Sequence, residues 1–238
     1  MSAFWLFLSF VLAKVTPNFI IPLFYKYQTI SQNSLREKIF KLFKTCDVSL
    51  QDVYSINMSV KTKKANAFVC GLGKNRRIVL TDTLMKEFST PEIEAIVAHE
   101  ISHYKHHDLI KMIAVNSGLT FLGFMATGYF LEGLLKYFGL TRIDDIAFLP
   151  VLALGLGILS FVAMPFLNAF SRALEYKADY FSLETTKNAP VFISMMEKLG
   201  RLNLAELEPH AWIEFFLYDH PAISKRIAVA KNFGNRHV

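Results

Sequence analysis

Two histidines and a glutamate at close spacing indicate what chemistry this chain can perform. His99 and His103 lie four positions apart, and Glu100 directly follows the first histidine. On a helix, residues four apart share one face, so both imidazoles would point at the same ion. The glutamate would then reach a water at that ion. This is the H-E-x-x-H pattern of zinc peptidases, in which the glutamate is the general base.

The alternative interpretation of this segment is a polar helix face that binds no metal. The neighbouring side chains disfavour it, because the segment is rich in isoleucine and valine and would be largely buried. Two imidazoles and a carboxylate in a buried helix need partners. A metal ion bound by the two imidazoles, with its water next to the carboxylate, would provide them.

A catalytic zinc ion takes three protein ligands and keeps one position open for water. We expect Glu175 to be the third ligand of a single zinc ion. Asp179 lies one helical turn later, where it would accept a hydrogen bond from the outer ring nitrogen of a ligand histidine. The alternative for both residues is a solvated helix face. His106 and His107 are expected at the surface, and Asp108 is expected to end the helix or to pair locally.

The elements that must position these residues follow from local patterns. A helix is predicted from Thr90, as its cap, to about residue 108, with a proline in its first turn. Residues 53–60, 66–72 and 77–81 predict a small antiparallel sheet in which residues 73–76 form a hairpin turn. Helical spacing of apolar residues predicts further helices, over 34–46, 172–186, 189–201, about 210–218 and 221–232.

Two long uncharged runs predict membrane-spanning helices. Residues 112–131 and 146–171 contain no charged side chain, and about 20 apolar residues span a bilayer. A buried helical hairpin in a soluble core is the alternative. Residues 1–25 are mostly apolar and predict a further membrane segment rather than a cleavable signal peptide.

The distribution of basic residues predicts the topology. Residues 26–111 contain 14 Lys and Arg and residues 172–238 contain 9, out of 26 in the chain. A hairpin returns the chain to the side that it left, so both blocks would face the cytoplasm, with residues 132–145 on the other side. The chain is 53% hydrophobic and only 19% charged, which excludes a disordered protein. No basic block with interleaved aromatic residues is present, and no nucleic-acid partner is expected.

The expected fold is therefore a mainly α membrane protein with a small antiparallel β-sheet. Its zinc protease domain, of the gluzincin type, is interrupted by a transmembrane helical hairpin. The expected divisions are an N-terminal membrane segment, a first catalytic half with the sheet and the zinc helix, the hairpin, and a second catalytic half with the third ligand. These correspond to residues 1–25, 26–111, 112–171 and 172–238.

Several motifs together resemble the type I CAAX prenyl endopeptidases, with HtpX-type heat-shock membrane proteases as more distant relatives. The similarity extends from about residue 4 to about residue 230. It rests on FIIPLFYK at 19–26, NAF at 66–68, RIVLTDTL at 77–84, HEISH at 99–103, SRALEYKAD at 171–179, and DHP at 219–221 with Arg226-Ile227. Members of that family have several more N-terminal spans, so this chain is interpreted as a fragment, a split gene or a compact relative.

The resemblance implies roles for particular residues. It implies that His99, His103 and Glu175 bind zinc and that Glu100 is the base. It also implies that His220 stabilises the transition state and that Arg226 lies nearby. Asn66, Ala67 and Phe68 would begin the edge strand that binds substrate. Without the resemblance, His220 would be interpreted as a structural residue before Pro221.

The predicted function is hydrolysis of peptide bonds by an integral membrane zinc metalloendopeptidase whose active site faces the cytoplasm. Its partners would be the membrane and peptide or protein substrates, including lipidated ones. Two alternatives remain open at this stage. One is a quality-control protease of damaged membrane proteins, and the other is a non-catalytic membrane module that keeps the fold.

Overall fold

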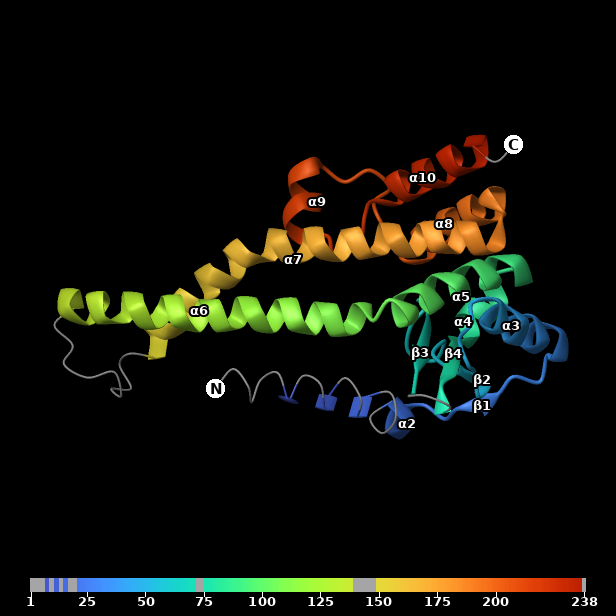
Figure 1. The fold of residues 1–238 in the computed structure, drawn as a ribbon, viewed down its shortest axis with the longest axis horizontal. Coiled ribbons are helices and arrows are strands. Elements are labelled where there is room, and N and C mark those ends of the chain that lie inside the picture. The colour runs from blue at the N-terminus through green and yellow to red at the C-terminus, as the bar shows by residue number, and fades with distance from the viewer. Residues whose placement is uncertain are drawn as a thin grey trace.

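Two long helices, α6 (Asp108–Phe138) and α7 (Leu149–Thr186), lie side by side along the molecule (Figure 1). The computed structural model describes residues 7–8, 11–12, 15–16, 21–71, 75–138 and 149–236. Most of the remaining elements gather near one end of this helix pair, whereas α9 lies beside the middle of α7 (Figure 1). The remaining elements are α2 (Ile21–Phe24), β1 (Gln28–Thr29), α3 (Asn33–Thr45), β2 (Asp52–Ile56), β3 (Ala67–Cys70), β4 (Arg77–Thr81), α4 (Asp82–Glu87), α5 (Thr90–Lys105), α8 (Ala189–Leu202), α9 (Ala211–Leu217) and α10 (Ile223–Arg236).

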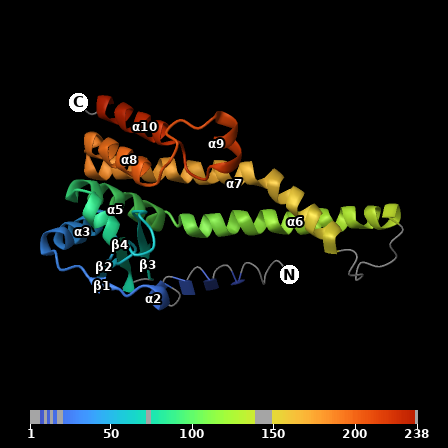
Figure 2. The same ribbon diagram turned by 180° about the vertical axis from the view of Figure 1, so that it is seen from behind.

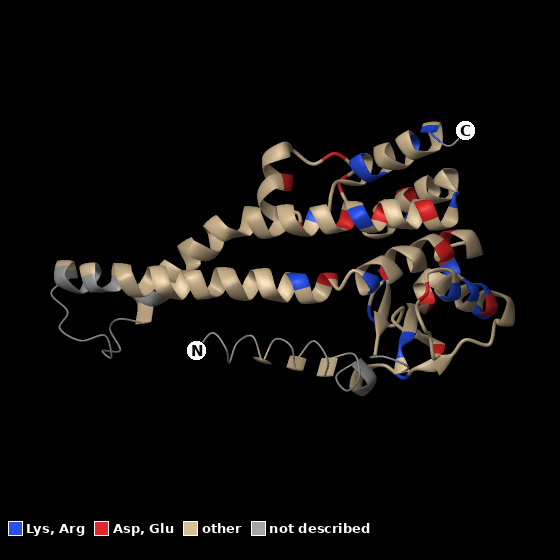
Figure 3. Ribbon diagram, in the orientation of Figure 1, with Lys and Arg blue, Asp and Glu red and all other residues tan. Residues whose placement is uncertain are grey.

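The long helices expose apolar surface. The segments Asp108–Phe130 and Ala153–Thr186 are long and apolar enough to cross a membrane, by length and composition. Their exposed side chains include Phe121, Met125 and Phe166. Figure 3 shows that charged residues cluster at one end of the molecule, whereas most of α6 and the first half of α7 show none. This exposure is inconsistent with a hairpin buried in a soluble core of this chain.

Helix α7 is continuous where the sequence suggested a span followed by a separate helix. It extends over 38 residues and contains Pro165. A proline inside a helix removes one backbone hydrogen bond and bends the helix, and both views show α7 changing direction along its length (Figures 1 and 2). One continuous helix therefore connects the apolar first half of α7 to Glu175, with no loop between them. The other predicted helices agree with α3, α8, α9 and α10 within a few residues.

The sheet is mixed, which corrects the antiparallel sheet expected from the sequence. Its strand order is β1-β2-β4-β3, and β2 pairs with β4 in parallel, Val53 opposite Ile78. Ile78, Val79 and Leu80 of β4 are fully buried, whereas Phe68 and Val69 of β3 are only partly buried. The strand with the most deeply buried residues, β4, lies inside the sheet beside β2, and β3 lies at an edge. Strand order of this kind does not follow from the alternation of residues along each strand.

The predicted pairing of 66–72 with 77–81 is confirmed, because β3 and β4 are antiparallel with Val69 opposite Ile78. Residues 72–74, which include the first half of the predicted turn at 73–76, lie outside the described residues. The same holds for most of the predicted N-terminal membrane segment, 1–25, and for 139–145 in the connection between the long helices.

The first turn of α5 is held by a buried carboxylate. The helix cap is Ser89, one residue before the predicted Thr90. The backbone N–H of Ser89 donates to Glu92 at 2.7 Å, and so does its hydroxyl, at 2.8 Å. Glu92 also accepts from Lys198 and Ser194 of α8, each at 2.7 Å. Burial alone raises the pKa of Glu92, but these donors outweigh burial and lower its pKa to about 2. This carboxylate ties the helix that contains both histidines to α8.

We expect Glu92→Gln to lower the free energy of unfolding by about 1–3 kcal/mol at neutral pH, since an amide cannot satisfy all of these donors. The folded-state pKa of Glu92 lies below its ordinary value of 4.5. Its stabilisation is therefore complete above pH 4.5 and is lost as the pH falls toward about 2. Thermal unfolding of the wild type and the variant across that range should converge at the acid end. Glu87→Gln, at an exposed position of α4, is the matched control, and an equal effect there would contradict the role of Glu92.

Candidate metal centre

The imidazoles of α5 converge on one point. His99 and His103 lie on the same helix face, with their Nε2 atoms 3.0 Å apart and their rings edge to face. Both nitrogens face the same space because four residues make about one helical turn. The helix is fixed there by fully buried apolar residues on its opposite side, including Val97 and Ile101.

Glu175 of α7 completes a group of three. Its Oε2 lies 3.3 Å from Nε2 of His99, and its Oε1 lies 3.2 Å from Nε2 of His103. One potential ligand atom from each residue lies within 4.8 Å of the other two. The structure thus brings together the three residues that the sequence analysis named as ligands.

The donor set fits a tetrahedral metal ion. Two imidazole nitrogens and a carboxylate oxygen are ordinary zinc ligands, with bonds of about 2 Å, which place neighbouring ligands roughly 3.3 Å apart. The separations of 3.0, 3.2 and 3.3 Å are close to that value. Oε2 of Glu175 is also buried and accepts no hydrogen bond from the described residues. A buried carboxylate oxygen without a donor is what a cation would satisfy.

Asp179 and Arg226 form a second layer behind His99. Oδ1 of Asp179 lies 3.0 Å from Nδ1 of His99. Arg226 of α10 donates to both carboxylate oxygens of Asp179, at 2.7 and 2.5 Å, and its Nη2 is 3.5 Å from Glu175. Asp179 is fully buried, so the bidentate arginine supplies the opposite charge that a buried carboxylate needs. Asp179 thus lies beside the outer nitrogen of His99, and the hydrogen bond expected between them stays a prediction.

Asp108 plays the equivalent part for His103 and was not assigned to the site from the sequence. Its Oδ2 lies 3.1 Å from Nδ1 of His103, and its Oδ1 accepts from Lys111 at 2.8 Å. Asp108 is buried at the first position of α6. The only signal in the sequence was an acidic residue five positions after a candidate ligand, and five is not a helical spacing. The chain turns between them at His107, whose φ is 56°.

The charges around the histidines favour a positive species between them. Burial alone lowers the pKa of His99, but the nearby carboxylates of Asp179 and Glu175 outweigh burial and raise that pKa to about 10. Burial raises the pKa of Glu100. Burial alone lowers the pKa of Arg226, and the charge of Asp179 raises it above its ordinary value. The imidazoles of His99 and His103 and the guanidinium of Arg226 thus lie among four carboxylates, those of Glu100, Asp108, Glu175 and Asp179.

A cavity of about 320 Å³ opens beside this cluster. The residues that line it include His99, Glu100, Glu175, His220 and Arg226. Nε2 of His220 is 3.5 Å from Glu175, while its Nδ1 is 2.9 Å from Asp219. The structure therefore places Glu100 and His220 at the same cavity as the three candidate ligands.

The edge strand β3 begins at this cavity. Asn66 and Ala67 line it, and β3 pairs with β4 along one side only among the described strands. The side chain of Phe68 packs against Ile56 and Val79 and does not line the cavity, and the expected part of Phe68 in an edge strand that binds substrate stays a prediction. Successive strand residues point to opposite faces, so Phe68 cannot share the cavity face with Ala67.

Comparisons with known proteins agree with this arrangement. Residues 29–233 match the model of peptidase family M48. Metalloprotease YhfN of Bacillus subtilis is 33% identical over 98% of this chain and 54% of its own length. The CAAX prenyl protease 1 homolog of Oryza sativa is 33% identical over 94% and 53%.

The fold is also that of a solved structure. Ste24p of S. mikatae superposes with a TM-score of 0.83 at 23% identity, over 96% of this chain and 57% of the other. The chain spans about half the length of these relatives. Because the family match covers most of the chain and includes both halves of the metal centre, this chain belongs to peptidase family M48, among the CAAX prenyl endopeptidases that its motifs resemble.

Proposed function

We propose that this chain is the catalytic part of a membrane zinc endopeptidase. The observation that supports it most is the convergence of His99, His103 and Glu175, from two elements, on one point beside Glu100 and a cavity. The two histidines and Glu175 would hold one zinc ion. When bound, zinc would polarise the scissile carbonyl and lower the pKa of a water molecule toward about 7.

Glu100 would act as the base in this mechanism. It follows His99 on the same helix and lines the cavity, where its carboxylate would accept a proton from the attacking water and pass it to the leaving amine. His220 lines the same cavity and would donate a hydrogen bond to the oxygen that develops negative charge. Asp179 and Asp108 would hold the ligand imidazoles in place through their outer nitrogens.

The substrate would be an extended peptide of a membrane-associated protein, including lipidated ones. The free edge of β3 starts at the cavity with Asn66 and Ala67, and an extended peptide adds to such an edge through backbone hydrogen bonds. The exposed apolar surface of α6 and α7 would keep that edge close to the membrane. Comparing hydrolysis of a prenylated peptide with that of the same peptide lacking its lipid would test the substrate class.

We expect Glu100→Gln to retain stoichiometric zinc and to lose peptidase activity by at least about 100-fold, because an amide cannot accept the proton of water. Zinc content by mass spectrometry and turnover of a fluorogenic peptide are the two measurements. Near-wild-type turnover in metal-free buffer would exclude Glu100 as the base. Loss of zinc together with activity would indicate that the variant has damaged the metal centre instead.

We expect Asp108→Asn and Asp179→Asn each to weaken zinc binding by about 10- to 100-fold, as happens when the partner of a ligand histidine loses its charge. Competition with a chromogenic chelator measures this affinity without any turnover. Lys111→Met is the matched control, since it removes the other partner of Asp108 and keeps the contact with His103. An unchanged zinc affinity in Asp108→Asn would mean that Asp108 serves only the start of α6 and does not support His103 as a ligand.

We also propose that both soluble halves face the cytoplasm. Cysteines introduced at the exposed positions 63 and 133, before α6 and near its end, should label from opposite sides of the membrane in intact cells. The two native cysteines are buried, which limits background labelling. Labelling of both positions from the same side would contradict a spanning hairpin, and labelling of position 63 from outside would invert the orientation.

A further inference from the structure

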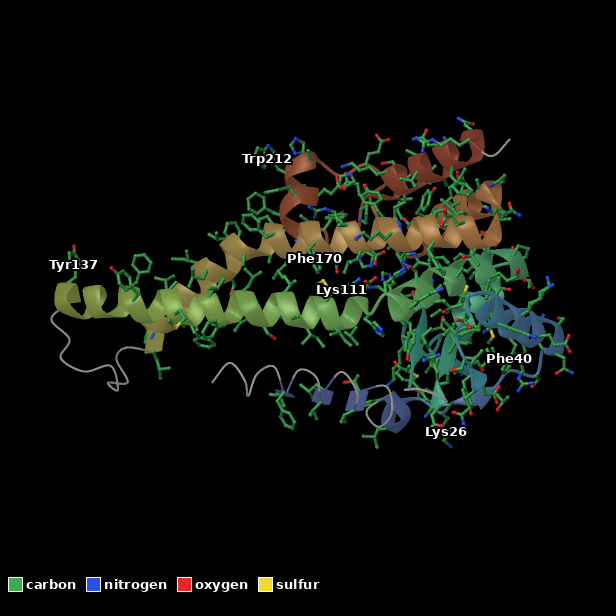
Figure 4. All side chains as sticks on the ribbon, viewed as in Figure 1. Lys26, Phe40, Lys111, Tyr137, Phe170 and Trp212 are labelled. Carbon is green, nitrogen blue, oxygen red and sulfur yellow. The ribbon has the colours of Figure 1, made fainter. Side chains whose placement is uncertain are left out.

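Helix α9 presents an exposed apolar face. Of its seven residues, AWIEFFL, only Glu214 is charged. The side chain of Trp212 is 67% exposed, that of Leu217 is 63% exposed, and those of Ile213 and Phe215 are exposed too. Figure 4 shows Trp212 projecting from α9 away from the long helices. A soluble surface seldom concentrates so much aromatic area, and such patches mark a binding face.

The position of α9 is fixed by α7. The ring of Phe216 stacks on Phe161 of α7 at a centroid distance of 5.5 Å. Farther along α7, the amide of Asn168 donates to the carbonyl of Phe216 at 2.6 Å. The Nη1 of Arg172 donates to the carbonyls of Glu214 and Tyr218, at 3.0 and 2.6 Å. These contacts place α9 beside residues 161–172, the last apolar turns of α7.

The polar side of α9 faces the opposite way. Glu214 is buried and accepts from the backbone N–H of Ala222 at 3.2 Å and from Lys225 at 2.6 Å. Its charge is thus neutralised on the side of α10. The exposed face of α9 lies next to exposed apolar residues of α7, among them Phe161 and Val162. The apolar surface of the spanning helix therefore continues onto α9.

We propose that α9 lies in the membrane interface, with Trp212 and Phe215 in contact with lipid. An element fixed beside residues 161–172 shares the depth of those residues, and the chain is uncharged from 146 until Arg172. Tryptophan favours the boundary between acyl chains and headgroups, and a helix with one apolar face can lie in that plane. A lipid occupant is favoured over a protein because the surface is continuous with the exposed apolar surface of α7, a helix long and apolar enough to cross a membrane.

The proposal affects the position of His220, which lies three residues after α9. A lipid-seated α9 would fix the height of that histidine relative to the bilayer, and with it the height of the cavity. This role for α9 does not depend on zinc or on hydrolysis. It would hold for an inactive relative with the same fold.

Tryptophan fluorescence tests the proposal. The chain has two tryptophans, so Trp5→Phe leaves Trp212 as the only one. The full chain would be reconstituted in phosphatidylcholine vesicles, either plain or brominated on the acyl chains near the headgroup. We expect bromine to quench a large share of the Trp212 emission, and aqueous iodide to quench little of it. The matched control is Leu204→Trp in a chain that lacks both native tryptophans, since Leu204 is 93% exposed in the charged half. The control should show the reverse pattern.

Two results would overturn the proposal. Quenching of Trp212 by iodide but not by brominated lipid would place α9 in water. Quenching by neither would mean that protein covers it, either a second copy or another segment. If Trp5→Phe does not fold, the difference between wild type and Trp212→Phe in the two lipids gives the same measurement.

Discussion

The packing of α7 against α5 is the constraint on which the site depends. The two histidines precede α6 in the chain, and Glu175 lies in the second half of α7. These residues can meet only if α5 and α7 pack in one fixed register. Buried contacts set that register, since the hydroxyl of Ser182 donates to the carbonyl of Ala95 at 2.7 Å, and Ala178 and Val97 are fully buried. A hydrogen bond between a side chain and a helix carbonyl in a dry interface cannot slide without leaving a polar group unpaired.

Charge compensation then fixes the ligands themselves. Buried carboxylates are costly unless each has an opposite charge and hydrogen bonds. Asp179 obtains both from Arg226, while Asp108 obtains a cation from Lys111. Of these three carboxylates, only Glu175 keeps one oxygen without a donor among the described residues. That oxygen lies 3.3 Å from Nε2 of His99, beside the point where the histidine nitrogens meet.

Much of this arrangement could be predicted from the sequence, because local patterns determine it. Placing His99 and His103 on one face requires only that the segment is helical, and recognising the candidate spans requires only the length of the uncharged runs. What could not be predicted depends on contacts between distant segments. The parallel pairing of β2 with β4 depends on which strand is buried most deeply, and the partnership of Asp108 with His103 depends on a turn at His107. Neither leaves a periodic pattern in the chain.

The shortness of β3 has a consequence for selectivity. The strand is four residues long and pairs along one side only among the described strands. A peptide added to it would be held at few positions, and its alternate side chains would point away from the cavity. Binding at so few positions would give little discrimination between peptide sequences. Selectivity would come instead from the effective concentration of peptides tethered to the same bilayer, which can exceed their bulk concentration by orders of magnitude. Confinement to a surface would then decide what is cleaved, more than the residues at the scissile bond.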